Sequence, residues 1–148
     1  MTHRQIVLVI GLAGAAIFAA TLFAQQKAGS EIVQAGIEAY NAKNVAYFEK
    51  NLADDVALID EDGHTLVGKT RVLPFLRNQL TDPTPRKLTA KNIHVGSTND
   101  AAWAYFAYTI EHEGKEPHNG NNSFVFRKTG NDWQIVLMHL SFDYPEHM

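Results

Sequence analysis

The sequence predicts an α+β fold: a cone-shaped, curved antiparallel sheet of about six strands, with helices on its concave face. Helical periodicity is confined to the first half of the chain, from residue 30 to residue 80. Strand-like alternation fills the second half, from residue 87 onward. The 148 residues show no repeat and no internal linker, which is typical of one domain. Helices laid across a curved sheet are expected to enclose a cavity.

Three helices are expected in the first half. Ser30 is a suitable N-cap for the first helix, whose apolar residues recur with a helical period. Asn44 interrupts this helix and can cap a second, short helix over residues 45–52. The third helix is expected over residues 70–80, with Pro74 either in its first turn or at a kink.

The strands are expected as one hairpin and a later meander. Residues 55–60 alternate and residues 64–67 return, around a turn at Asp62 and Gly63, a dipeptide that tight hairpins favour. From residue 87 onward, polar turns separate four further stretches with strand character. These four strands should pair in antiparallel order.

Composition narrows the function classes. The chain is 45% hydrophobic and 20% charged, with a formal net charge of −3, as in soluble globular proteins. No basic face is evident, so no nucleic-acid partner is expected. The absence of cysteine excludes disulfides, thiol nucleophiles and thiolate metal sites. No other metal-ligand spacing stands out, and we predict neither a metal nor a cofactor.

The N-terminal segment, residues 1–24, is typical of a secretory signal peptide. A short basic start precedes an uncharged apolar stretch, and small residues near its end allow cleavage after Ala24. Residues 6–24 are also long enough to form an uncleaved membrane anchor. With either alternative the folded domain, residues 25–148, would be periplasmic or secreted, and would meet a membrane only if the segment is retained.

Three stretches together resemble the nuclear transport factor 2-like superfamily: residues 31–60, the EDGHTLVGK hairpin, and the ending NSFVFRKTGNDWQIVLMHLSF. The ending resembles the association domain of calcium/calmodulin-dependent protein kinase and its SnoaL-like relatives. Some of those relatives carry a second histidine where this chain has Leu137. The resemblance, over about residues 30–143, implies a cystatin-like cone with a cavity and frequent dimerisation. It does not imply one activity, since ketosteroid isomerases, cyclases, dehydratases and assembly domains share the fold.

The last strand supplies the first candidate residues. Alternation from Trp133 puts His139 and Ser141 on the expected cavity face. His139 could accept a proton or bind a ligand, or it could be an ordinary core histidine. The opposite phase of the strand is apolar after Gln134 and lacks a covering helix, so we expect it to form a homodimer interface. This stripe consists of Val136, Met138, Leu140 and Phe142.

Asp60 is the second catalytic candidate. It ends a strand in phase with apolar residues, where an unpaired carboxylate is costly. Asp60 should therefore either sit in the cavity as a general base with a raised pKa or cap the hairpin turn.

Further ligand contacts are expected from aromatic and basic side chains. Tyr40 lies on the inner face of the first helix, and Trp103 and Tyr105 lie on the longest strand. Such aromatics form the core or, near an open end, the wall of a pocket. Arg127 would bind an anion if its strand face is internal, and would otherwise be a surface residue.

Two functions remain open. The first is an exported SnoaL-like domain that binds a small, partly apolar ligand in its cavity or serves as a dimeric assembly module. The alternative is an isomerase, cyclase or dehydratase that uses His139 or Asp60 as general base. This enzyme requires both residues to face one solvent-accessible cavity.

Overall fold

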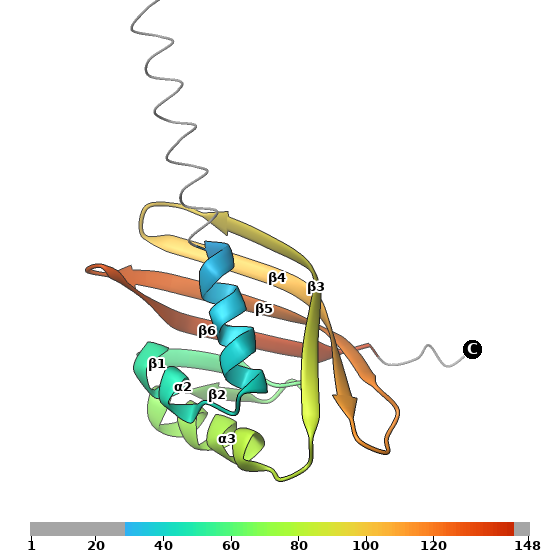
Figure 1. The fold of residues 1–148 in the computed structure, drawn as a ribbon. Helices are drawn as coiled ribbons and strands as arrows, with labels where there is room; N and C mark the ends of the chain where they lie inside the picture. The colour runs from blue at the N-terminus through green and yellow to red at the C-terminus, as the bar shows by residue number, and fades with distance from the viewer. Residues whose placement is uncertain (1–28, 144–148) are drawn as a thin grey trace, which may run out of the picture.

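The computed structural model describes residues 29–143, which form helices and one curved sheet (Figure 1). The predicted signal segment, residues 1–24, lies outside the described residues. The first helix covers residues 29–41. The other elements are α2 (Val45–Asn51), β1 (Leu52–Ile59), β2 (Thr65–Val67), α3 (Lys69–Thr81), β3 (Arg86–Ser97), β4 (Ala101–His112), β5 (His118–Thr129) and β6 (Asp132–Phe142).

The six strands pair in the order β2-β1-β6-β5-β4-β3. Strands β3 to β6 form the predicted antiparallel meander, and β1 pairs with β2 as the predicted hairpin. The α+β fold with six strands is therefore confirmed. One pair departs from the fully antiparallel prediction, because β1 runs parallel to β6. This pairing joins the N-terminal hairpin to β6, the free edge of the meander. Sequence alternation does not predict which strands pair when they are far apart in the chain.

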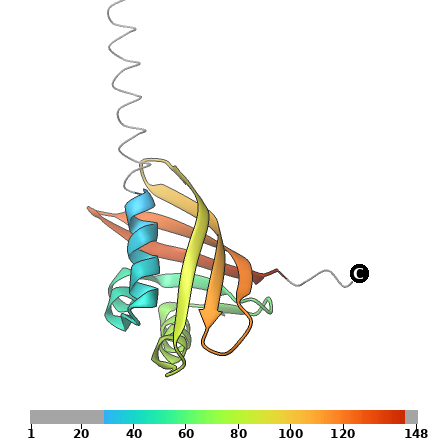
Figure 2. The same cartoon turned by 45° about the vertical axis from the view of Figure 1, so that its right-hand side comes forward.

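All three helices lie on the concave side of the sheet (Figures 1 and 2). The first helix crosses the meander, while α2 and α3 pack beside β1 and β2. The side chains between these layers form one hydrophobic core. Its largest almost fully buried members are Leu52, Val56, Leu58, Val72, Phe106 and Tyr108.

Local signals set the helix ends. Asn44 caps α2, since its side chain accepts a hydrogen bond from the Tyr47 backbone N–H at 3.2 Å. Helix α3 begins at Lys69, so Pro74 lies inside the helix and beyond its first turn. Pro74 is on the exposed side of α3, and the helix continues to Thr81.

A β-bulge in β6 reverses the predicted faces of the last strand. Ile135 pairs with Phe126 and Leu137 pairs with Val125, so Val136 has no partner on β5. The parallel pairing with β1 skips Val136 as well. One extra residue exchanges the two faces for everything that follows it.

The predicted dimer stripe is therefore wrong in its residues. After the bulge, Met138, Leu140 and Phe142 point to the concave side, where Met138 is buried and the other two pack against the core. Placement of His139 and Ser141 on the cavity face is wrong for the same reason, because these residues now alternate to the convex face.

Gly120 is required where β5 passes the end of β6. A Cβ added at Gly120 would lie 2.0 Å from the Ser141 carbonyl oxygen and 2.7 Å from the Tyr108 hydroxyl. We expect Gly120→Ala to lower the free energy of unfolding by about 2 kcal/mol, because a backbone contact cannot relax as a side chain can. Urea denaturation measures this loss.

Gly36→Ala is the matched control. A Cβ there meets nothing closer than the Tyr47 hydroxyl at 3.8 Å. Alanine in this helix should raise stability by about 0.5 kcal/mol or more. Equal effects of the two substitutions would contradict the steric argument.

Candidate functional site

A cavity lies between the helices and the concave face of the sheet. Two cross-strand rows form its floor. Phe106, Asn122 and Leu140 are neighbours on β4, β5 and β6, and Phe124 pairs with Met138 in the next row. The bulge at Val136 is what brings Met138 and Leu140 into these rows.

The remaining walls come from every helix, from the β1–β2 turn and from the outer strands. They are Gly36, Ile37, Tyr40, Phe48, Glu61, Phe75, Leu76, Gln79, Leu88 and Ile110. The cavity has a volume of about 50 Å³. Since one water needs roughly 10–15 Å³ of such space, a few waters or a small organic group fit. Ligands of drug size occupy pockets of roughly 300–1,000 Å³, so this cavity suits a smaller molecule.

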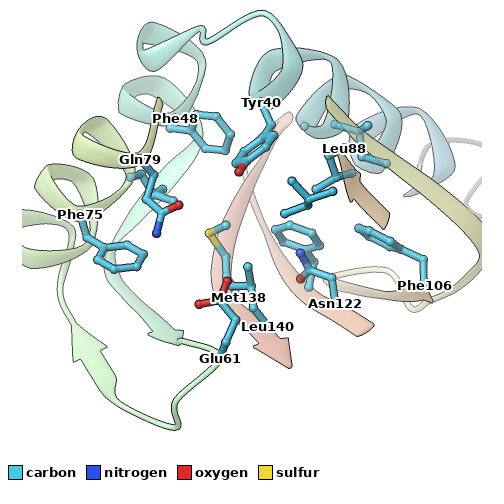
Figure 3. Close-up of a pocket in the computed structure, with 15 residues that line it drawn as sticks. Tyr40, Phe48, Glu61, Phe75, Gln79, Leu88, Phe106, Asn122, Met138 and Leu140 are labelled. Atoms are coloured by element: carbon cyan, nitrogen blue, oxygen red, sulfur yellow. The ribbon is translucent and has the colours of Figure 1, made fainter. Parts of the chain in front are cut away.

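Four polar side chains interrupt this apolar lining: Tyr40, Glu61, Gln79 and Asn122 (Figure 3). Asn122 is the most buried, at 4% exposure, and is the only buried polar residue of the described core. Its Oδ1 is fully buried and has no hydrogen-bond partner among residues 29–143. An unpaired buried amide oxygen costs about 1–3 kcal/mol, so the cavity retains a polar group at the expense of stability.

The amide of Gln79 is held in place by Arg86, which lies outside the cavity lining. Arg86 donates to Gln79 Oε1 at 3.2 Å and to the Gln79 backbone carbonyl at 2.5 Å. Arg86 in turn pairs with Asp82 at 3.2 Å. Arg86 thus engages the Gln79 oxygen, and Figure 3 shows the Gln79 amide at the cavity wall, between Phe48 and Phe75.

The predicted ligand contacts divide between the two faces of the sheet. Tyr40 lines the cavity, as its helical position predicted. Trp103 and Tyr105 do not; they lie on the convex face, 45% and 54% exposed. Tyr105 stacks on His94 there, with ring centroids 4.7 Å apart.

His139 and Ser141 share the convex face. Tyr105, Ser123 and His139 are cross-strand neighbours in one row, and His139 is exposed. The Ser141 hydroxyl donates to the Asn121 carbonyl at 3.3 Å. The predicted arrangement of His139 and Ser141 beside a cavity ligand is therefore not present.

Asp60 takes the turn-capping role that the sequence left open. Its Oδ1 accepts the backbone N–H groups of Asp62 and His64 at 3.1 and 2.8 Å, and its Oδ2 meets the His64 ring at 3.3 Å. Partial burial raises the pKa of Asp60, but these contacts outweigh it and the net pKa is lowered. A lowered pKa is the opposite of what a cavity base needs.

Arg127 is a surface residue. It forms a bidentate ion pair with Asp55, at 2.9 and 2.7 Å, and both side chains are exposed. The hydrogen bonds from Arg127 lower the pKa of Asp55. Arg127 is thus engaged away from the cavity and does not form the internal anion site considered above.

Sequence reasoning missed Glu61, Gln79 and Asn122. Asn122 had a usable signal, because it precedes Phe124 and Phe126 in the same strand phase. Glu61 and Gln79 had none, since they reach the cavity from a turn and from a helix that come together only in the folded chain.

Two further properties bear on the site. Among residues 29–143, no group of three or more histidine, aspartate or glutamate side chains is arranged to hold a metal ion. Within the same residues, no helix is long and apolar enough to span a membrane.

The fold and the cavity together define an NTF2-like cone. Among solved structures, an NTF2-like protein of unknown function from Pseudomonas putida KT2440 is similar at 19% identity, with a TM-score of 0.72, covering 82% of this chain and 90% of that chain. A candidate dehydratase of the NTF2-like family from Streptomyces avermitilis is 17% identical, with a TM-score of 0.72, covering 84% of this chain and 99% of that chain. The association domain of CaMKII from C. elegans is 18% identical, with a TM-score of 0.69, covering 82% of this chain and 98% of that chain.

A family model of the SnoaL-like domain matches residues 30–145. The chain therefore belongs to the SnoaL-like domain family, and the predicted resemblance is confirmed. No curated protein matches this sequence. Identities of 17–19% to the solved structures show a shared fold and leave the activity to be argued from the site.

Asn122 yields a stability prediction. Leucine has nearly the shape of asparagine and needs no hydrogen bond, so Asn122→Leu should raise the free energy of unfolding by about 1 kcal/mol. The control is Asn121→Leu, at the neighbouring exposed position, which should change stability by less than about 0.5 kcal/mol. A destabilised Asn122→Leu protein in urea denaturation would contradict the unpaired state of the Asn122 amide.

Proposed function

We propose that this SnoaL-like domain binds a small, mostly apolar molecule in the cavity beneath its helices. The observation that carries the proposal is the unpaired Asn122 amide oxygen in a mostly apolar cavity. Most lining residues are aliphatic or aromatic, and burial of apolar ligand surface against them supplies the driving force. The few polar groups then orient the ligand.

The isomerase-type alternative requires Asp60 or His139 as a general base in the cavity. Neither Asp60 nor His139 lines the cavity, and Asp60 is engaged in its turn. Glu61 is the only carboxylate on the cavity wall, and the described lining residues include no histidine and, besides Glu61, only Tyr40 as a titratable group. Ligand binding without an assigned reaction is therefore the function we propose.

Filling the cavity tests this proposal. Wild-type protein should bind the neutral probes 1-pentanol and benzyl alcohol, seen as saturable amide chemical-shift changes around the cavity in NMR titration. Leu140→Phe places a ring in the cavity and should weaken binding at least tenfold. Leu137→Phe is the matched control, because Leu137 lies on the same strand but on the convex face of the sheet.

Equal binding by the two variants would place the probes outside the cavity. Absence of saturable binding to the wild type by either probe would also contradict the proposal. Circular dichroism establishes that each variant is folded before it is titrated.

A second candidate function is self-assembly through the convex face. Trp103, Tyr105 and Val67 are exposed there, at 45%, 54% and 56%. Trp103 and Val67 end one cross-strand row, whose middle members Val125, Leu137 and Ala57 are half-buried. A continuous apolar row across a sheet is typical of an interface, and a two-fold pair would cover it on both copies. The likeness to an association domain supports this candidate.

Charge on this face should disrupt the dimer. We expect the wild type to sediment as a dimer, and Tyr105→Lys to shift it to monomer, because each copy would bury an ammonium group against the apolar convex face of the other. Asn78→Lys adds the same charge on exposed α3 and should leave the dimer intact. A monomeric wild type, or a dimeric Tyr105→Lys protein, would contradict the interface.

We also propose that the domain is exported to the periplasm or secreted. The basic start, apolar stretch and small residues of segment 1–24 support export, and the family match begins after this segment, at residue 30. N-terminal sequencing of the protein from an expressing cell would distinguish cleavage after Ala24 from a retained anchor.

A further inference from the structure

The charge on the cavity lining is negative only. Among the fifteen described residues that line it, none is lysine, arginine or histidine, and Glu61 is the only charged one. Glu61 is half-buried in the β1–β2 turn and forms no ion pair with a cation of the described chain. Its charge also reaches the buried Tyr108: burial raises the pKa of Tyr108, and the Glu61 carboxylate raises it further.

Arg86 is a cation directly behind the wall, but it is already paired. It donates to both oxygens of Gln79, and the Asp82 carboxylate, 3.2 Å from its guanidinium, compensates its charge. Glu61 lines the same space that a ligand would fill. Because this side chain is half-buried and its neighbours are apolar, salt screens its charge less than the charge of an exposed carboxylate.

The other lining groups favour the same ligand chemistry. The buried Asn122 Oδ1 needs a hydrogen-bond donor. Five aromatic rings line the walls, and the faces of such rings attract cations. They belong to Tyr40, Phe48, Phe75, Phe106 and Phe124.

Building on the cavity binding proposed above, we infer that the site selects small apolar molecules that carry an amine or ammonium group over carboxylates of the same size. The ammonium group would pair with Glu61 and donate to Asn122 Oδ1, while the apolar part lies against the rings. A carboxylate in the same place would face Glu61 and the Asn122 oxygen with no cation among the lining residues to compensate, a loss that the neutral donors Gln79 and Tyr40 do not offset.

Two matched series test the selection by NMR titration of the full domain. The first is pentylamine, 1-pentanol and butanoate, and the second is benzylamine, benzyl alcohol and benzoate. In each series the amine should bind about tenfold or more tightly than the carboxylate, as expected for one charge-assisted contact. The alcohol should fall between them.

Glu61→Gln removes the charge and keeps the shape. The amine should then lose about tenfold in affinity, while the alcohol changes little. Glu111→Gln is the control, since it makes the same change in net charge at an exposed position outside this cavity and should leave all affinities unaltered.

The outcomes separate the two proposals. Tighter binding of carboxylates, or an amine preference that survives Glu61→Gln, overturns the selection by Glu61 while cavity binding stands. Saturable binding of no member of either series overturns cavity binding and the amine selection together.

Discussion

The β-bulge at Val136 is the constraint on which the site depends. A strand at the centre of the sheet exposes one phase of its side chains to the helices and the other to the convex side. By leaving Val136 unpaired on both neighbours, the bulge brings Met138 and Leu140 to the concave side. Without this shift, His139 and Ser141 would occupy the cavity floor, and the site would have a titratable base in place of a thioether and an aliphatic wall.

The cavity combines two requirements that oppose each other. A sheet covered by helices is most stable when the space between them is filled and apolar. Here the space is incompletely filled, and Asn122 brings an unpaired amide into it. Protein cores rarely combine both departures at one point, and this combination is what the proposed ligand binding would explain. Arg86, which is paired with Asp82, also holds the Gln79 oxygen at the cavity wall.

The convex face carries two large aromatic side chains that the sequence pattern alone could not distinguish from pocket residues. Trp103 and Tyr105 have the size and polarity of pocket aromatics, yet β4 alternation directs both outward, opposite Phe106. Trp103 lies over Gly96 on β3, where a Cβ would come within 2.3 Å of the indole. Trp103 thus covers the backbone of β3 on an open face, while Tyr105 stacks on His94. If a second copy packs there, the cavity and the interface lie back to back on the same strands, and ligand binding and assembly share β5 and β6.

The sequence by itself determined the elements and the fold class. Helical periodicity, the Asn44 cap and the Asp62–Gly63 turn depend on neighbours within a few residues, so they can be read locally. Tyr40 was placed correctly for the same reason, because helix phase is continuous. Only the tertiary structure decided the parallel β1–β6 pairing and the composition of the cavity. A bulge depends on the register of two partner strands, and Glu61 and Gln79 meet Asn122 only when a turn, a helix and a strand distant in sequence are brought together by burial.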